Sequence, residues 1–245
     1  MPELIGIIPA RYKSSRFPGK PLADIHGKPM VWWVFQNAIQ VNELSKVYVA
    51  TDDARIKETC QKYNMPYIMT SDQHPTGTDR IAEVAQNIDA DFYINIQGDE
   101  PLTSSITIKK ALQPIYTEEE FDVINLMTEI TDTSDLINST VPKVAVNNKN
   151  EAIFFSRSGI PFPKNKRPRY YKQVCVYVFS KNALKQFSTL AQGPIEQAED
   201  IEILRFLENR MVVKMIEVEE ATVAVDTPSD LEIVRKLLLE RKKLL

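Results

Sequence analysis

The stretch LIGIIPARYKSSRFPGKPL, residues 4–22, joins an apolar run to a loop that gathers four cations into ten residues. Its first five residues are apolar and rich in isoleucine, and they predict a strand. In open α/β sheets, ligands bind beyond the carboxyl ends of the strands. The cationic loop therefore lies where a ligand is expected, although the chain as a whole is slightly acidic.

Short apolar runs and helical patterns alternate through the first half of the chain, which predicts an α/β fold with a mostly parallel sheet and helices on both faces. The second half is more mixed, so we expect one α/β domain with an inserted or appended lobe. The predicted strands are residues 4–8, 46–51, 66–70, 92–96, 143–147, 152–157, 171–180 and 212–218. The predicted helices are residues 28–40, 54–63, 79–87, 195–208 and 227–244.

Composition excludes several classes of protein. The 245 residues include 30 Lys and Arg against 33 Asp and Glu, a net charge of −3, whereas nucleic-acid binding usually needs a broad basic face. No run approaches the roughly 20 apolar residues of a membrane span, and the apolar start lacks the basic flank of a signal peptide. Cys60 and Cys175 provide no disulfide framework and no metal cluster. We therefore expect a cytoplasmic protein.

The cationic loop has side chains that suit a polyphosphate. Arg11 and Arg16 can each contact phosphate oxygens with two N–H groups, and Lys20 supplies a compact point charge. Ser14 and Ser15 add short hydroxyl donors. The loop matches neither the GxxxxGK[ST] nor the GxGxxG nucleotide motif. A solvated basic loop without a ligand is the alternative.

Two stretches place a carboxylate where a metal ion could bind. INIQGDEP, residues 94–101, delivers Asp99 at the carboxyl end of a strand, although a cap of the next turn would also explain it. VAVDTPSDLE, residues 223–232, contains a helix start with Thr227 as its N-cap, but that start leaves Asp226 unexplained. Asp99 and Asp226 together would form a two-carboxylate Mg²⁺ site.

Two further stretches contain candidate ligand contacts. In HPTGTDR, residues 74–80, Thr78 is predicted to cap a helix whose free N–H groups could bind an anion or a base edge. FFSRSGIPFP, residues 154–163, places Arg157 at the end of a strand, where it pairs with a substrate carboxylate or is an ordinary exposed arginine. The chain has only two histidines and no nucleophile elbow, which argues against hydrolase chemistry.

Six motifs now define a resemblance. IPARYKSSRFPGKPL, VATDD, HPTGTDR, YINIQGDEP, SRSGIPFP and VDTPSDLE occur in the order and spacing of the 3-deoxy-manno-octulosonate (Kdo) cytidylyltransferases, and the resemblance covers essentially the whole chain. It implies a Rossmann-like nucleotidyltransferase fold over residues 1–245, with an acceptor-side and dimerisation lobe near residues 140–190. It also implies a homodimer, CTP, Mg²⁺ and transfer of CMP to Kdo, which gives CMP-Kdo and pyrophosphate for lipopolysaccharide or capsule assembly.

The resemblance also assigns roles to individual residues. The catalytic set is Lys20, Arg16, Asp99 and Asp226, of which the two aspartates bind magnesium. The nucleotide-binding set is Pro9, Ala10, Arg11, Ser14, Arg16, Lys20, Thr78, Arg80 and Gln97, with Arg80 on the cytosine side. The sugar-acid set is Arg157, Gln173, Tyr177 and Glu202, with Arg157 expected to meet the carboxylate.

The chain departs from the family on the acceptor side. KQVCVY, residues 172–177, has Gln173 and Cys175 where Lys-His-x-Gly-x-Tyr is expected. IEILR, residues 201–205, keeps Glu202 but has Ile203 where a glutamine is expected. Either the pocket tolerates these changes and the acceptor is Kdo, which we favour, or the acceptor is a different 2-keto-3-deoxy acid, such as an amino-substituted Kdo or a nonulosonic acid. A non-catalytic nucleotide-binding protein is the third hypothesis, which the intact Lys20, Asp99 and Asp226 oppose.

Overall fold

The computed structural model describes residues 1–14, 16–117, 120–166, 168–219 and 223–243. The chain forms two compact units. The first unit comprises residues 1–109 and 222–245, and the second comprises residues 110–221. The second unit is thus inserted into the chain of the first. The range 140–190, for which we expect the acceptor-side role, lies inside the second unit.

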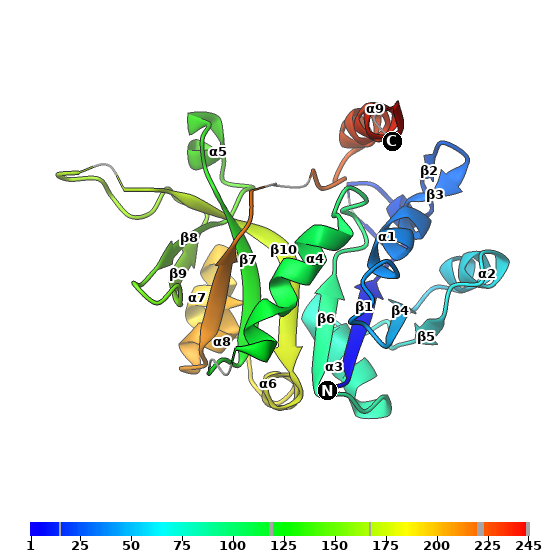
Figure 1. Cartoon of the computed structure of the whole chain (residues 1–245), viewed down its shortest axis with the longest axis horizontal. Coiled ribbons are helices and arrows are strands. Elements are labelled where there is room, and N and C mark those ends of the chain that lie inside the picture. The colour runs from blue at the N-terminus through cyan, green and yellow to red at the C-terminus, as the bar shows by residue number, and fades with distance from the viewer. Residues whose placement is uncertain (15, 118–119, 167, 220–222, 244–245) are drawn as a thin grey trace. The chain divides into compact units, whose positions relative to one another are not determined.

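The first unit is built on a parallel sheet. Its strands lie in the order β6 (Phe92–Ile96), β1 (Leu4–Pro9), β4 (Lys46–Thr51) and β5 (Tyr67–Met69), as Figure 1 shows. Leu4, Ile5, Ile7 and Ile8 are almost completely buried, because a strand in the middle of such a sheet is covered on both faces. The predicted strands of this half are confirmed to within a residue or so at their ends, and so is the parallel arrangement.

Helices and short elements precede, connect or follow these strands. They are η1 (Lys20–Leu22), β2 (Asp24–Ile25), β3 (Lys28–Pro29), α1 (Met30–Ala38), α2 (Ala54–Lys62), α3 (Gly77–Asn87), α4 (Ser105–Leu112) and α9 (Pro228–Lys243). The helix predicted from residue 28 begins at Met30 instead, since residues 28 and 29 pair with the β2 strand and Pro29 is the N-cap. At α2, the Asp53 carboxylate accepts a hydrogen bond from the Arg55 amide at 2.9 Å.

The C-terminal helix belongs to the core of the first unit. Val225, Leu231, Val234 and Leu238 form one apolar cluster with residues from β2, α1 and the loop after β6. Because this packing fixes the chain on both sides of Asp226, that carboxylate has a defined place in the first unit although it lies near the end of the sequence.

The second unit has a mixed sheet. Strand β7 (Val123–Glu129) lies between β11 (Val213–Glu217), which is parallel to it, and β10 (Tyr171–Ser180), which is antiparallel. Strand β8 (Lys143–Val146) pairs with both β10 and β9 (Ala152–Ser156), antiparallel in each case. The helical elements are η2 (Gln113–Tyr116), α5 (Thr133–Ile137), α6 (Lys181–Phe187), α7 (Pro194–Glu199) and α8 (Leu204–Glu208). The sequence did not predict β7, α5 or α6 of this unit, nor β2, β3 or α4.

One predicted helix of this unit is wrong. Residues 195–208 form α7 and α8 instead of a continuous helix, because Asp200 adopts the left-handed conformation, with φ 51° and ψ 50°. The two short helices are joined by a buried ion pair, in which Arg205 donates to both oxygens of Glu196 at 2.8 and 2.7 Å. In the described part of the chain, no helix has the length and apolar character needed to cross a membrane.

Candidate active site

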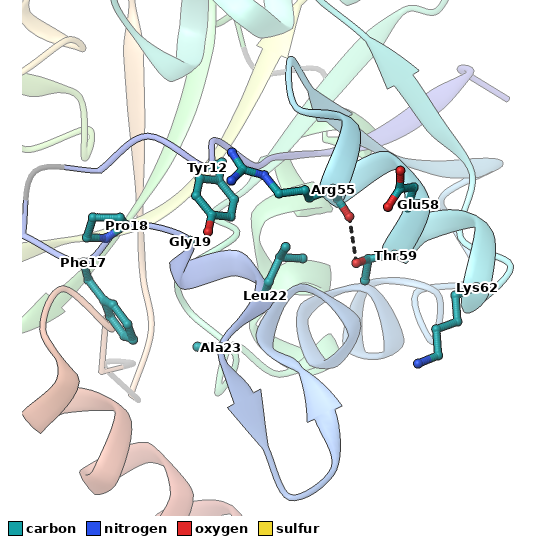
Figure 2. A pocket seen from close by; sticks show the side chains of 10 residues that line it. All are labelled: Tyr12, Phe17, Pro18, Gly19, Leu22, Ala23, Arg55, Glu58, Thr59 and Lys62. Carbon is teal, nitrogen blue, oxygen red and sulfur yellow. Dashed lines mark hydrogen bonds between the residues drawn. The ribbon is translucent and has the colours of Figure 1, made fainter.

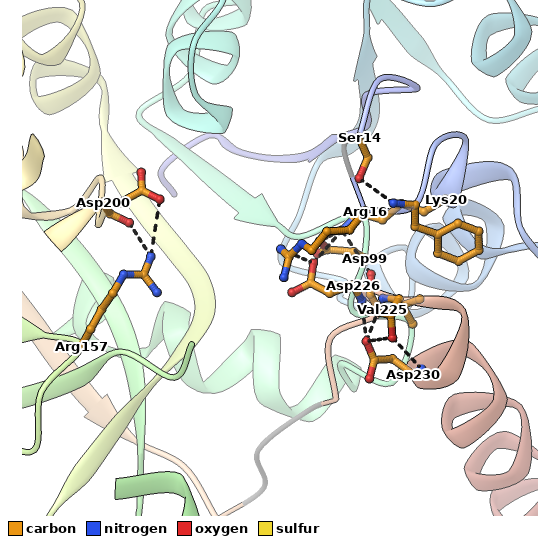
Figure 3. A network of polar contacts seen from close by, with 11 residues as sticks. Ser14, Arg16, Lys20, Asp99, Arg157, Asp200, Val225, Asp226 and Asp230 are labelled. Atoms are coloured by element: carbon orange, nitrogen blue, oxygen red, sulfur yellow. Dashed lines mark hydrogen bonds and ion pairs between the residues drawn. The ribbon is translucent and has the colours of Figure 1, made fainter. Parts of the chain in front are cut away.

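A cluster of opposite charges lies at the carboxyl edge of the first unit's sheet (Figure 3). The Lys20 Nζ donates to Asp99 Oδ2 at 2.6 Å, to Asp226 Oδ1 at 3.2 Å and to the Val225 carbonyl at 3.1 Å. Arg16 Nη2 lies 3.1 Å from the same Asp226 oxygen. The structure therefore brings together the four residues that we predicted as the catalytic set.

The backbone explains why these groups meet. A Cβ atom at Gly98 would lie 2.6 Å from the Pro9 carbonyl oxygen, so only glycine allows the loop after β6 to pass this close to the end of β1. The next residue, Asp99, accepts a backbone hydrogen bond from the Val225 amide at 2.9 Å. That bond fixes Asp226 beside Asp99, although residues 223–226 form no regular strand.

The start of α9 has the predicted capping arrangement. Thr227 Oγ1 accepts a hydrogen bond from the Asp230 amide, and Asp230 Oδ2 accepts one from the Thr227 amide at 2.8 Å. Asp230 also accepts from the backbone amide of Asp226 at 3.1 Å. The Asp226 side chain takes no part in this cap, so its carboxylate is free to face the cation cluster.

The charges of the cluster keep Lys20 protonated. Burial by itself would lower the pKa of Lys20, but the Asp99 and Asp226 carboxylates more than offset it, and the pKa is raised above the ordinary value of 10.5. The Lys20 side chain is only 16% exposed, while those of Arg16 and Asp226 are 59% and 38% exposed. One side of the cluster is therefore open to a ligand.

Two other residues of the cationic loop make local contacts. Arg11 is exposed and donates to the Pro75 carbonyl at 3.2 Å, which ties the loop to the segment before α3. Ser14 Oγ accepts a hydrogen bond from the Phe17 amide at 3.3 Å and so closes a turn. Ser15, the second predicted hydroxyl donor, lies outside the described residues.

The outer side of the loop forms a pocket of about 610 Å³ against α2 (Figure 2). Gly19 has φ +73°, and its amide donates to the Tyr12 carbonyl at 2.8 Å, which closes the loop on itself. The Arg55 guanidinium lies 3.2 Å from the centre of the Tyr12 ring. This stacking holds the loop against α2.

The segment before α3 differs from expectation in one detail. Thr76, and not Thr78, is the N-cap, because the helix begins at Gly77 and the Thr76 hydroxyl accepts from the Asp79 amide at 3.2 Å. Thr78 lies in the first turn and is buried. The role of Thr78 in nucleotide binding stays a prediction.

Arg80 is fully buried instead of being displayed on the surface. Its Nη1 donates to the Thr70 hydroxyl, and its Nη2 lies 3.2 Å from Asp52 Oδ1. Burial lowers the pKa of Arg80, while the Asp52 carboxylate opposes that shift and the nearby Arg11 adds to it. Asp52 belongs to the VATDD motif, but its role could not be predicted from the sequence because its partner lies 28 residues away.

The remaining nucleotide-side residues lie at the ends of strands. Pro9 ends β1, and the next residue, Ala10, donates its amide to the Ala50 carbonyl at 2.9 Å. Gln97 follows β6 directly and is half-buried. Their positions at the carboxyl edge of the sheet agree with a ligand site there, and their individual roles stay predictions.

The donor set fits a magnesium ion. Asp99 Oδ2 and Asp226 Oδ1 share one ammonium group, so they can lie no farther apart than the two hydrogen bonds combined. Mg²⁺ prefers one or two carboxylates plus water and substrate phosphates to an all-protein cage. The described residues contain no group of three or more His, Cys, Asp or Glu side chains suited to a metal, and Mg²⁺ binding by Asp99 and Asp226 stays a prediction.

In the second unit, Arg157 contacts backbone carbonyls. Its Nε donates to Glu199 O at 2.5 Å, its Nη1 to Ser139 O at 3.0 Å and its Nη2 to Asp200 O at 2.8 Å, and Figure 3 shows its contact with Asp200. Its Nη2 also lies 3.6 Å from the Asp200 carboxylate, so one N–H on Nη1 remains for a further acceptor. Carboxylate binding by Arg157 stays a prediction, and the structure adds an anchoring role.

Lys143 supports this arrangement and had no role in the sequence analysis. It is completely buried, and its Nζ donates to the carbonyls of Asn138, Val141 and Arg157. Burial lowers its pKa, and the Arg157 charge adds to that shift. Glu199 accepts hydrogen bonds from the Ser156 hydroxyl at 2.6 Å and the Arg157 amide at 2.8 Å. The sequence signal that could have predicted this role is a lysine at the start of the otherwise apolar strand at residues 143–146.

The other predicted sugar-acid residues lie on β10 and before α8. Gln173, Cys175 and Tyr177 are half-buried and alternate with buried valines, so they share one face of β10. Glu202 precedes the α8 N-cap, Ile203, whose side chain is 2% exposed and belongs to the core. Burial among apolar groups accounts for Ile203, and the contact of these residues with the acceptor stays a prediction.

Comparison with known proteins shows which class of enzyme this chain belongs to. The family model described as Cytidylyltransferase matches residues 5–217, so the chain belongs to the cytidylyltransferases and is a nucleotidyltransferase enzyme. Its relatives include the 3-deoxy-manno-octulosonate cytidylyltransferases of Escherichia coli, 41% identical over 98% of each chain, and of Lawsonia intracellularis, 42% identical over 98% of this chain and 96% of the relative.

A solved structure agrees with this assignment. The structure of CMP:2-keto-3-deoxy-manno-octonic acid synthetase complexed with CTP has a TM-score of 0.94 and 40% identity, and the match covers 98% of this chain and 99% of that one. The protein is thus a member of the 3-deoxy-manno-octulosonate cytidylyltransferase family. The nucleotidyltransferase fold implied by the sequence motifs is confirmed.

Proposed function

We propose that this enzyme transfers CMP from CTP to the anomeric hydroxyl of Kdo and releases pyrophosphate. The observation that carries the proposal is the contact of Lys20 with both Asp99 and Asp226 at the carboxyl edge of the sheet. A relic that only binds a nucleotide has no need to hold two carboxylates around one half-buried cation. Identity to relatives named for this reaction supports the same conclusion.

The reaction needs positioning and neutralisation of charge more than covalent help from the protein. The anomeric oxygen of the sugar acid attacks the α-phosphorus of CTP, a new O–P bond forms, and the bond to the β-phosphate breaks. The hydroxyl gives up its proton, and pyrophosphate leaves. Lys20 and Arg16 provide positive charge for the phosphate oxygens, and Lys20 stays protonated at neutral pH because its pKa is raised above 10.5.

Asp99 and Asp226 are the residues that would hold Mg²⁺. When bound, the ion supplies neutralisation of phosphate charge and a lower pKa for the attacking hydroxyl. The two carboxylates thus have two uses in this chain: they hold Lys20 in place and offer oxygen ligands. This assignment explains why the site needs no histidine as a general base, although His74 lies near the start of α3.

The acceptor side is proposed to lie on the second unit, with Arg157, Gln173, Tyr177 and Glu202 as its contacts. Kdo is the favoured acceptor because it gives the relatives their name. A different 2-keto-3-deoxy acid is the alternative, because Gln173 and Cys175 replace the expected histidine and glycine. We further propose a cytoplasmic homodimer whose product feeds lipopolysaccharide or capsule assembly.

Release of pyrophosphate from CTP tests the proposal. Wild-type protein with Mg²⁺ is given CTP and, separately, Kdo, an amino-substituted Kdo and a nonulosonic acid, and turnover is expected to be highest with Kdo. Asp99→Asn should abolish turnover while the protein stays folded. Asp91→Asn is the matched control, since Asp91 precedes the other end of β6 and its carboxylate accepts a hydrogen bond from the Glu3 amide at 2.7 Å. Full activity of Asp99→Asn would refute the metal assignment, and turnover with another acid alone would replace Kdo.

A further inference from the structure

Asn125 makes an unusual set of contacts inside the second unit. It is completely buried on β7, and its Nδ2 donates to the carbonyls of Val174 and Val176, both at 2.9 Å. Its Oδ1 accepts a hydrogen bond from Gln173 Nε2 at 3.0 Å. One buried amide side chain thus links β7 to three residues of the neighbouring strand β10, at positions 173, 174 and 176.

The reason is a bulge in β10. Along the β7–β10 ladder, Val174 faces Leu126, whereas Tyr177 faces Asn125, so two extra residues lie between these pairs. A bulge leaves backbone groups without their ladder partners, and buried carbonyls need a donor. Both N–H groups of the Asn125 amide supply that need. The amide cannot turn over, because its oxygen would then face two carbonyl oxygens.

This fixed orientation determines how Gln173 must lie. Because the Asn125 oxygen accepts from Gln173, the Gln173 amide turns its nitrogen toward β7. The Gln173 Oε1 atom then points away from Asn125, on the half-buried face that Gln173 shares with Cys175 and Tyr177. An amide oxygen only accepts hydrogen bonds. The face therefore presents an acceptor at this position.

We propose that Asn125 is a positioning residue that determines acceptor specificity through Gln173. It holds the Gln173 amide so that Oε1 accepts a hydrogen bond from one hydroxyl of the sugar acid. This inference rests on the proposed function and goes further, because it states which group of the substrate must be a donor. Asn125 itself does not touch the substrate.

A cycle of enzyme and substrate changes tests the contact. The substrates are the sugar acid that wild-type protein turns over, its analogues lacking one hydroxyl each, and the matching fluoro analogues, which cannot donate. For one hydroxyl, the deoxy and fluoro analogues should each lose about 5- to 100-fold in kcat/KM with wild type, as expected when a buried polar group is left unpaired. With Gln173→Leu, the same analogues should lose no more than about two-fold relative to the parent sugar acid.

Two further variants test the fixed amide. Gln173→Glu turns the inward nitrogen into an oxygen facing Asn125 Oδ1, so KM for the sugar acid should rise about 5- to 100-fold while KM for CTP stays within about two-fold. Gln173→His, whose ring N–H can donate to Asn125, should stay within about five-fold of wild type. If Gln173 had a purely structural role, Gln173→Glu would change the melting temperature without raising KM for the sugar acid more than KM for CTP.

Asn125 is tested in the background of Gln173→Leu. If Asn125 acts through Gln173, adding Asn125→Asp should lower the melting temperature but leave KM for the sugar acid within about two-fold of Gln173→Leu alone. A further rise in that KM, equal losses for every analogue in both enzymes, or normal binding by Gln173→Glu would each overturn the proposal. Lack of turnover with Kdo would correct the proposed acceptor, and the cycle would then be run with the acid that reacts.

Discussion

Replacing Lys20 by methionine is the most direct test of the charge cluster. The side chain is only 16% exposed, and its Nζ lies 2.6 Å from Asp99 and 3.2 Å from Asp226, so the charge is held in place before the substrate arrives. Removing one such preorganised group typically costs about 2.7–4 kcal/mol of transition-state stabilisation. We therefore expect kcat for Lys20→Met to fall about 10²- to 10³-fold.

The fold should survive this change. Asp99 and Asp226 keep 26% and 38% of their side-chain surface in contact with water, which screens the repulsion that the missing ammonium leaves behind. We expect the free energy of unfolding to fall by no more than about 2 kcal/mol. The assay is steady-state pyrophosphate release from CTP at saturating sugar acid, with urea unfolding measured on the same preparation.

Lys13→Met is the matched control, because Lys13 is an exposed cation of the same loop. Its kcat should stay within about three-fold of wild type, as is usual for a surface charge. If Lys20→Met lost no more activity than Lys13→Met, the reasoning that places the phosphates beside Lys20 would be refuted. An unfolded Lys20→Met protein would show instead that the cluster is mainly structural.

Three further predictions concern stability. Because the pKa of Lys20 is raised in the folded protein, its charge contributes fully to the free energy of unfolding below the unfolded pKa of 10.5, and this contribution is lost as pH rises through the higher folded pKa. The melting temperatures of wild type and Lys20→Met should therefore converge only above pH 10.5. A difference that disappears between pH 6 and 9 would contradict this prediction. Gly98→Ala should lower the free energy of unfolding by about 1–3 kcal/mol, because its Cβ would lie 2.6 Å from the Pro9 carbonyl oxygen. Gly77→Ala should lower it less in the same urea titration, because its Cβ would meet only the Pro9 ring, at 3.9 Å. Arg157→Ala removes three bonds to backbone carbonyls and should lower the free energy of unfolding by about 2–4 kcal/mol as well as raising KM for the sugar acid; a rise in KM at unchanged stability would show that substrate binding is its only role.

Local patterns were sufficient for most of the elements. Strands such as β1, β4 and β6 are short apolar runs, and α2 follows a capping aspartate, so each signal lies within a few residues of the element that it predicts. One predicted helix was wrong because the contact that decides it is distant. The break at Asp200 separates helices joined by the Arg205–Glu196 pair, and nothing near residue 200 distinguishes it from the interior of a helix.

The sequence by itself determined which chemistry the chain offers: a cationic loop after an apolar strand, one aspartate at the carboxyl end of a strand, and a second aspartate that the following helix cap does not explain. Only the tertiary structure decided which of these groups meet, because Asp99 and Asp226 lie 79 and 206 residues from Lys20 along the chain. It also decided which donors are already in use, as for Arg157 and Asn125, whose partners are backbone carbonyls. Every residue has such a carbonyl, so no residue type in the sequence marks these partners, and only folding brings them within hydrogen-bond distance.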